Sequence, residues 1–355
     1  MKVKSILSVA VLLGILSWQC KKTEDGLGTQ KSLKESLNAS TQNLNAAISE
    51  ITNSRGYQLI SLGGTNKAAS LKSGDFHDSI TLAKIAGVYE FHAQHPASWC
   101  FWCYQKLFEK TGDTSVLIVK LPSDKIFHPG RFEECRAADT SLVNNFVITA
   151  NDYHYYFSRD FLFDYKLAAN VNVSDTAIGS MDIFADRNDS AYNRSASFTF
   201  PNGYSIKTSY ASGDSATSSI SLENGSTVLF KENVSRVKNS GHKYRDKYYS
   251  LTIGNVEIQK ASATDSITVY VDGVLQTNAK VEFIENVSNN GEEGGMCRHN
   301  DRDIKITFDD GTSVLVSDLI KPSLTVMQGL AQSLGSVYFA SYFVNYVAVS
   351  IYYNH

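Results

Sequence analysis

The stretch Phe198-Thr-Phe-Pro-Asn-Gly-Tyr-Ser-Ile206 ("FTFPNGYSI", residues 198–206) carries the clearest structural signal in this chain. Apolar residues alternate with polar ones on both sides of Asn202-Gly203, which is the pattern of two half-buried strands. Asn-Gly supplies the positive backbone angles that a tight two-residue hairpin requires. The stretch therefore predicts a β-hairpin.

Three more stretches repeat this pattern of alternating strands around a turn dipeptide. Their turns are Asn224-Gly225, Asp272-Gly273 and Asp310-Gly311. Strands joined by such short turns are antiparallel neighbours, so the sequence predicts a mainly β fold, an antiparallel meandering sheet or sheets. The turns are unevenly spaced, which argues against a regular repeat such as a propeller.

A helix is predicted before the strands. Ser32 and Glu35 fit a capping box, in which a serine accepts at the helix start and a carboxylate follows three residues later. Leucine, isoleucine and alanine then recur at helical spacing between Leu33 and Ile51, and Gly56 ends the run. We expect an amphipathic N-terminal helix of about five to six turns that packs on the sheet.

A second, apolar helix is predicted at the C-terminus. Pro322-Ser323 marks its expected start, and no charged side chain follows before His355. Serines, tyrosines, Gln328, Gln332 and Asn345 dilute this segment too much for a typical membrane span. The sequence favours a helix buried against the sheet, with a change to strand near Val347 as an alternative.

Composition and charge set the class of protein. The chain has 355 residues, of which 43% are hydrophobic and 19% charged, and its formal net charge is -3. This composition is typical of a globular protein, and the absence of a basic block argues against nucleic-acid binding. We expect residues 31–355 to form a β-rich globular domain with flanking helices, and a subdivision near residue 170 stays open.

The first thirty residues predict export. Lys2 and Lys4 precede an apolar run from Ile6 to Leu16, a pattern typical of a secretion signal. The following "ILSWQCKK" resembles the lipobox of bacterial lipoproteins, in the relaxed form found in Bacteroidetes. The resemblance implies a signal peptide over residues 1–19, lipidation of Cys20 and a polar tether over residues 20–30. It also implies a protein held on the outer membrane by its lipid, on the periplasmic or the surface side.

The remaining cysteines are Cys100, Cys103, Cys135 and Cys297, and the first two lie in "SWCFWCY" (residues 98–104). In an oxidising envelope compartment an even number favours disulfides, with three pairings open. A Cys-x-x-Cys after tryptophan is also compatible with a thiol-redox centre. Cys100, Cys103, Cys297 and His299 are alternatively a Cys3His metal set.

Aromatic residues alternate on both sides of a predicted turn at Ser158-Arg159-Asp160. They are Tyr153, Tyr155, Phe157, Phe161, Phe163 and Tyr165. Such side chains usually fill a β core, and they alternatively line a groove for sugars or lipid chains.

No catalytic motif stands out in the sequence, whether a nucleophile elbow, a zinc-protease helix, a P-loop or a dinucleotide glycine pattern. We therefore expect no cofactor and no catalysis, and a binding or structural role in the cell envelope, with an unknown protein or glycan partner. Two alternatives remain open. One is a carrier that holds a hydrophobic ligand in an aromatic-lined β groove, and the other is a thiol-redox or metal-handling protein that uses the Cys-x-x-Cys.

Overall fold

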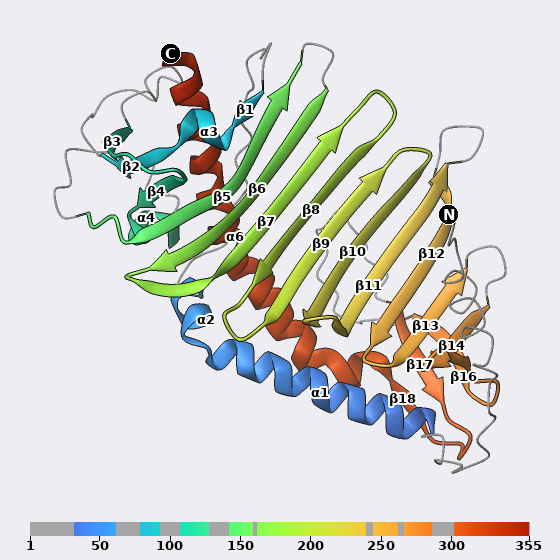
Figure 1. The fold of residues 1–355 in the computed structure, drawn as a ribbon. Coiled ribbons are helices and arrows are strands. Elements are labelled where there is room, and N and C mark those ends of the chain that lie inside the picture. The colour runs from blue at the N-terminus through green and yellow to red at the C-terminus, as the bar shows by residue number, and fades with distance from the viewer. Residues whose placement is uncertain are drawn as a thin grey trace, which may run out of the picture. The chain divides into compact units, whose positions relative to one another are not determined.

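The computed structural model describes residues 32–61, 79–92, 107–127, 142–158, 162–238, 244–261, 266–285 and 302–354. Within the chain, Leu33–His355 form one compact unit. A 15-stranded sheet dominates this unit, and helices lie on one side of it (Figure 1). The predicted mainly β class with a helix at each end of the domain is confirmed.

The large sheet is mostly a simple meander. Strands β4 to β15 lie side by side in chain order, and β2 and β3 extend the sheet beyond β4. Neighbours are antiparallel except for β2 and β4, which run parallel, so the sheet is mixed at that end. The strands of its first half are β1 (Ile80–Thr81, paired with β5), β2 (Gly87–Phe91), β3 (Phe108–Gly112), β4 (Leu117–Leu121), β5 (Phe146–Phe157), β6 (Phe163–Val173), β7 (Thr176–Arg187) and β8 (Tyr192–Thr199). Those of its second half are β9 (Tyr204–Ser212), β10 (Ser215–Asn224), β11 (Thr227–Lys238), β12 (Tyr244–Ile253), β13 (Val256–Ala261), β14 (Ile267–Val271) and β15 (Val274–Leu275).

A small second sheet follows the large one in the chain. It consists of β16 (Lys280–Glu285), β17 (Arg302–Thr307) and β18 (Ser313–Leu315). The rings of Tyr249 and Phe283 meet edge to face with centroids 6.2 Å apart, which packs β16 against β12.

All the hairpins predicted from turn dipeptides are present. Asn202-Gly203 joins β8 to β9, and Asn224-Gly225 joins β10 to β11. Asp272-Gly273 joins β14 to β15, and Asp310-Gly311 joins β17 to β18. Each glycine has a positive φ, from +59° at Gly225 to +88° at Gly203, as these turns require.

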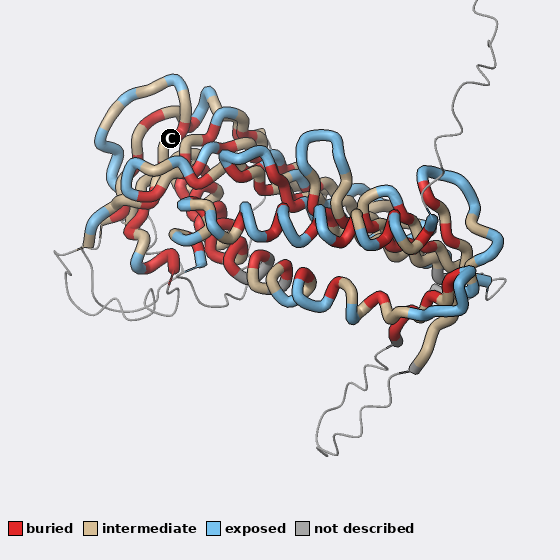
Figure 2. The backbone as a smooth tube through the Cα atoms, turned by 90° about the horizontal axis from the view of Figure 1, so that it is seen from below, coloured by how far each residue is buried: buried red, intermediate tan, exposed pale blue. Residues whose placement is uncertain are grey.

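Helices cover one face of the large sheet. They are α1 (Leu33–Asn53), α2 (Arg55–Ile60), α3 (Leu82–Ile85), α4 (Ser123–Phe127) and α6 (Val316–Asn354). Figure 2 shows α1 and α6 on the same side of the sheet, with buried residues along both helices. Leu37, Leu44 and Ile51 of α1 are fully buried, as expected for the apolar stripe of an amphipathic helix.

Helix α1 crosses the strand ends and is tied to their turns. Ser40 Oγ lies 3.0 Å from Asn255 Oδ1 in the β12–β13 turn, and Tyr204 Oη of β9 donates to Glu50 Oε2 at 2.8 Å. The ten residues from Ser40 to Glu50 rise about 15 Å, and the three to four strand spacings from β9 to the β12–β13 turn cover about 14–19 Å. The spacing of these two contacts along α1 therefore matches the spacing of the strands that they reach.

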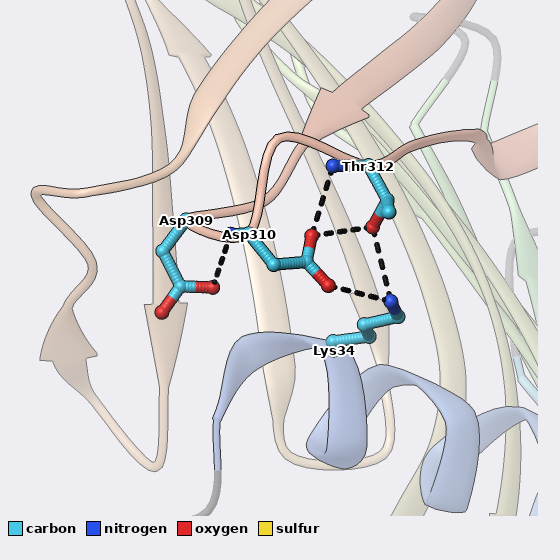
Figure 3. Close-up of polar contacts among 4 residues, drawn as sticks. All are labelled: Lys34, Asp309, Asp310 and Thr312. Atoms are coloured by element: carbon cyan, nitrogen blue, oxygen red, sulfur yellow. Dashed lines mark hydrogen bonds and ion pairs between the residues drawn. The ribbon is translucent and has the colours of Figure 1, made fainter.

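The N-terminal end of α1 is held by the β17–β18 turn (Figure 3). Lys34 Nζ donates to Asp310 Oδ2 at 2.8 Å and to Thr312 Oγ1 at 3.0 Å, and the Thr312 amide donates to Asp310 Oδ1 at 2.9 Å. The hydrogen bond from Lys34, followed by those from Thr312, lowers the pKa of the Asp310 carboxyl below its usual value.

This lowered pKa predicts a pH-dependent contribution to stability. A carboxylate with a depressed folded-state pKa stabilises the fold above the unfolded pKa of about 4, and the contribution is lost as pH falls through the lower folded pKa. We expect Asp310→Asn to lower Tm at pH 7 in low salt, and this difference from wild type to shrink at acidic pH and in 1 M salt. Thermal melts between pH 7 and pH 2 measure it. A Tm difference that is the same at every pH would contradict the assignment.

Helix α6 begins earlier than the sequence suggests. The expected start was Pro322, but the helix runs from Val316 and contains Pro322 within its second turn. Asp303 of β17 supports this earlier start because Oδ1 accepts hydrogen bonds from the amides of Ile304 (2.7 Å) and Ser317 (3.2 Å), and Oδ2 accepts from the Ser317 hydroxyl. A buried carboxylate thus satisfies a free N–H in the first turn of α6.

Removal of this carboxylate is expected to be costly. Asp303→Ala leaves the Ser317 amide and hydroxyl without their acceptor, so we expect a loss of about 1–3 kcal/mol in the free energy of unfolding. Asp309→Ala, which removes an exposed carboxylate from the nearby turn, is the control, with an expected change within about 0.5 kcal/mol. Urea unfolding measures both, and equal losses would contradict a capping role for Asp303.

The last part of α6 is apolar enough to resemble a membrane span. Ser333–Tyr352 has a mean hydropathy of 1.3, and 56% of this window is buried inside the protein. Val337, Ala340 and Val344 are each fully buried. The helix continues to Asn354, without the change to strand near Val347. A core helix of a globular protein has this combination of composition and burial.

Candidate functional site

The two faces of the large sheet differ in what covers them. Residues of β5 to β14 that point toward α1 and α6 form the apolar core, while no helix among the described residues lies over the opposite face (Figure 1). We call this second side the open face. On it, the ladder places Phe184, Ser195, Ser209 and Ser219 in one row across β7 to β10.

A shallow depression of about 380 Å³ lies on the open face. It extends over six consecutive strands, from Lys166 on β6 to Lys231 on β11. Five strand spacings correspond to about 24 Å, so the depression suits an elongated ligand that lies across the strands. Its outward-facing serines are Ser195, Ser197, Ser209, Ser219 and Ser221.

Small side chains explain why the surface is hollow here. Ser195 faces Ser209 across the ladder, and Ser209 faces Ser219, so three hydroxymethyl groups follow one another on neighbouring strands. The hydroxyls of Ser209 and Ser219 are hydrogen-bonded at 2.7 Å. Phe184 stands at the end of this row and is 41% exposed, which leaves a ring available beside the serines. Serine is not among the residues that favour strands, so its repeated use here points to a need for space or hydroxyls.

Charged groups at the edges of the depression are mostly paired. Lys207 Nζ is bound to Glu223 Oε2, and the Ser221 hydroxyl donates to Glu223 Oε1 at 2.8 Å. Lys166 Nζ lies 2.6 Å from Asp152 Oδ2. Within the described part of the chain, Lys231 has no ion-pair or hydrogen-bond partner. Asp182 accepts a hydrogen bond from the Ser197 hydroxyl at 3.5 Å. The depression therefore offers hydroxyls, the Lys207–Glu223 pair, one carboxylate and one amine.

The two carboxylates that line the depression do not have the geometry of a glycosidase. The backbones of Asp182 on β7 and Glu223 on β10 are three strand spacings apart, or about 14 Å, and the carboxyl groups of a glycosidase's catalytic pair are about 5–9.5 Å apart. Burial alone raises the pKa of Glu223, but the hydrogen bonds from Lys207 and Ser221 outweigh it and lower the pKa overall. A general acid requires the opposite shift. This arrangement is suited to binding through hydrogen bonds.

The predicted aromatic groove residues lie on the other side of the sheet, beneath α6. Tyr153, Tyr155 and Tyr165 are buried, with 2%, 3% and 6% of their surface exposed, and their rings contact one another edge to face. Tyr153 Oη donates to Asn345 Oδ1 of α6 at 2.8 Å. Phe163 packs edge to face on Tyr155. Phe157 is partly buried against the same core, and Phe161 lies outside the described residues.

Burial raises the pKa of the Tyr153 and Tyr165 hydroxyls above the usual value for tyrosine. These phenols therefore stay protonated at neutral pH, and a ligand would reach the rings only if α6 moved away from the sheet. In this conformation these aromatic residues are part of the hydrophobic core.

The predicted cysteine chemistry falls on residues that the structure does not describe. Cys20, Cys100, Cys103, Cys135, Cys297 and His299 all lie outside the described ranges. Among the residues that the structure does describe, no group of three or more histidine, cysteine, aspartate or glutamate side chains is placed to hold a metal ion.

Comparisons with known proteins give no family for this chain. No family model matches it, and neither a curated protein nor a solved structure is significantly similar to it.

Proposed function

We propose that this chain is a lipid-anchored cell-envelope protein that binds a neutral glycan on the open face without cleaving it. The observation that carries this proposal is the depression across β6 to β11, which is lined by serine hydroxyls, paired charges and an exposed phenylalanine. The anchor rests on the lipobox-like sequence that ends at Cys20 and on the polar sequence of residues 20–30 that precedes the folded unit in the chain. The outer membrane is the proposed location.

Several features favour a neutral glycan over other ligands. Sugar hydroxyls both donate and accept hydrogen bonds, and the serines at the floor of the depression do the same. Lys207 and Glu223 are already paired, so they offer hydrogen bonds without demanding a charged ligand. The exposed ring of Phe184 offers an apolar surface on which the C–H face of a sugar packs. The wide separation of Asp182 and Glu223 supports binding without hydrolysis.

The proposal is tested by filling the depression. Tyrosine favours strands, so Ser209→Tyr is expected to fold normally while its ring occupies the space in which the ligand lies. We expect wild-type protein to be retarded in native gels that contain a soluble glucan, mannan or xylan, and Ser209→Tyr to weaken this retention about tenfold or more, which corresponds to about 1.4 kcal/mol.

A matched control separates this effect from a general change of the surface. Thr268 lies on the same face of β14, outside the depression, so Thr268→Tyr adds the same ring elsewhere. Retention should be unchanged in this variant. If none of these polysaccharides retards wild-type protein, or if both variants behave alike, the proposed function is wrong.

A further inference from the structure

A second polar cluster lies on the helix-covered side of the sheet, at the strand ends far from α1. Helix α1 is bonded to the turns at one end of the strands, through Ser40 and Glu50. At the opposite ends of β7, β8 and β9, the same face carries Arg187, Tyr192, Arg194 and Tyr210. We call these four residues the arginine–tyrosine cluster.

The strand register brings these four side chains together. Arg187 faces Tyr192, and Arg194 faces Tyr210 on the next strand. The tyrosine rings of Tyr192 and Tyr210 are tilted, with centroids 6.1 Å apart. Because Ala185 faces Arg194 in the ladder, Arg187 and Arg194 are diagonal neighbours at about 7–8 Å between their backbones. Two cations thus share one surface with two rings.

Neither guanidinium is neutralised within the part of the chain that the structure describes. Arg187 and Arg194 are exposed, and neither makes an ion pair or a hydrogen bond with the described residues. Asp186, which precedes Arg187 in β7, is on the open face together with its ladder partners Asp164 and Asn193. Its carboxylate is therefore on the other side of the sheet from the two arginines. Like charges on neighbouring strands are unfavourable by themselves, so the pair is best explained by an anionic partner.

Tyr338 of helix α6 is within electrostatic range of this cluster. The positive charge of Arg194 acts on the Tyr338 hydroxyl of α6, where it opposes the rise in pKa that burial causes. Arg194 is itself exposed, and Tyr210, which is 42% exposed, faces it from the next strand. The Arg194 guanidinium thus lies on the same surface as the Tyr210 ring and has no hydrogen-bond acceptor among the described residues.

We propose that the arginine–tyrosine cluster binds an acidic sugar residue through its carboxylate. A guanidinium donates two parallel hydrogen bonds to a carboxylate, which gives both energy and orientation. The exposed ring of Tyr210 and the half-buried ring of Tyr192 then contact the sugar ring and offer hydroxyls to its polar groups. A simple inorganic anion would use the arginines alone, so the rings favour a uronic acid. This site lies on the opposite side of the sheet from the depression and goes beyond the proposed function.

The experiment observes the arginine side chains directly. The Nε–Hε signals of Arg187 and Arg194 in ¹⁵N-labelled protein are followed while sodium glucuronate, glucose or inorganic phosphate is added at the same ionic strength. We expect saturable shifts with glucuronate, and at least about tenfold weaker binding of glucose and of phosphate, since hydrogen bonds to a charged group and ring contacts act together. Arg194→Gln should weaken glucuronate binding about tenfold or more.

Arg236→Gln is the matched control, because Arg236 is exposed on the same face of β11, away from the cluster. It should bind glucuronate as wild type does. Equal binding of phosphate and glucuronate, an unchanged affinity in Arg194→Gln, or equal losses in the two variants would each overturn the proposal. Failure of neutral glycans to bind the depression would leave this result unaffected, because that test probes the open face.

Discussion

Replacing Gly179 with alanine is expected to lower the free energy of unfolding by about 3 kcal/mol or more. Gly179 lies in β7 beside a register shift in the β6–β7 ladder, and its φ of +153° is one that residues with a side chain rarely adopt. A Cβ at this position would stand 2.4 Å from the Thr199 carbonyl oxygen and 2.6 Å from the Phe198 ring. Because the nearest atom is backbone, rotation of a side chain does not relieve the clash.

The control for this prediction is another glycine with positive φ. Gly225 forms the β10–β11 turn with φ +59°, and a Cβ there would meet nothing within 4 Å. Gly225→Ala therefore carries only the backbone cost, about 1 kcal/mol. Urea unfolding of both variants measures the difference. Equal losses would mean that the close packing of β7 on β8 is absent from the folded protein.

Placing a charge in the middle of α6 is expected to have an even larger effect. Val337 lies in α6 and is fully buried in the core that the helix forms with the sheet. Val337→Asp puts a carboxylate into this layer of buried apolar side chains, where its desolvation is costly. We expect a loss of about 4 kcal/mol or more, which is enough to unfold many domains of this size.

The same charge on the outer side of the helix provides the comparison. Thr325 is exposed on α6, so Thr325→Asp should change the stability by about 0.5 kcal/mol or less. Circular dichroism and thermal melts in detergent-free buffer measure both variants. A Val337→Asp protein as stable as wild type would contradict the role of α6 as the core helix of the sheet.

The sequence predicted those parts of the fold that depend on local chemistry. The hairpin at Asn202-Gly203 and the helix after Ser32 each follow from a few neighbouring residues, and both are present. The turn between β6 and β7 was missed because it uses Ser174 and Asp175, both with positive φ and neither a glycine. The start of α6 was misplaced because its support comes from Asp303, which is distant in sequence.

The candidate site was harder to predict because it depends on strand register. Alternating serines such as Ser195-Ala196-Ser197 and Ser219-Ile220-Ser221 signal strands with one polar face. Only the ladder shows that Ser195 and Ser219 lie in one row through Ser209. The aromatic residues around Tyr153 and Tyr165 were recognised as either core or groove, and the position of α6 over them makes them core.

The most direct test of the central claim compares two exposed rings on opposite sides of the sheet. Phe184 at the depression is 41% exposed, and Tyr210 on the other side is 42% exposed, so free protein presents both to solvent almost equally. Hydroxyl-radical footprinting is carried out with and without the neutral polysaccharide that retards the protein most strongly. If the glycan binds on the open face, it protects Phe184 from oxidation and leaves the oxidation of Tyr210 unchanged. Protection of Tyr210 with Phe184 unchanged would contradict the account and move the glycan site to the opposite side of the sheet.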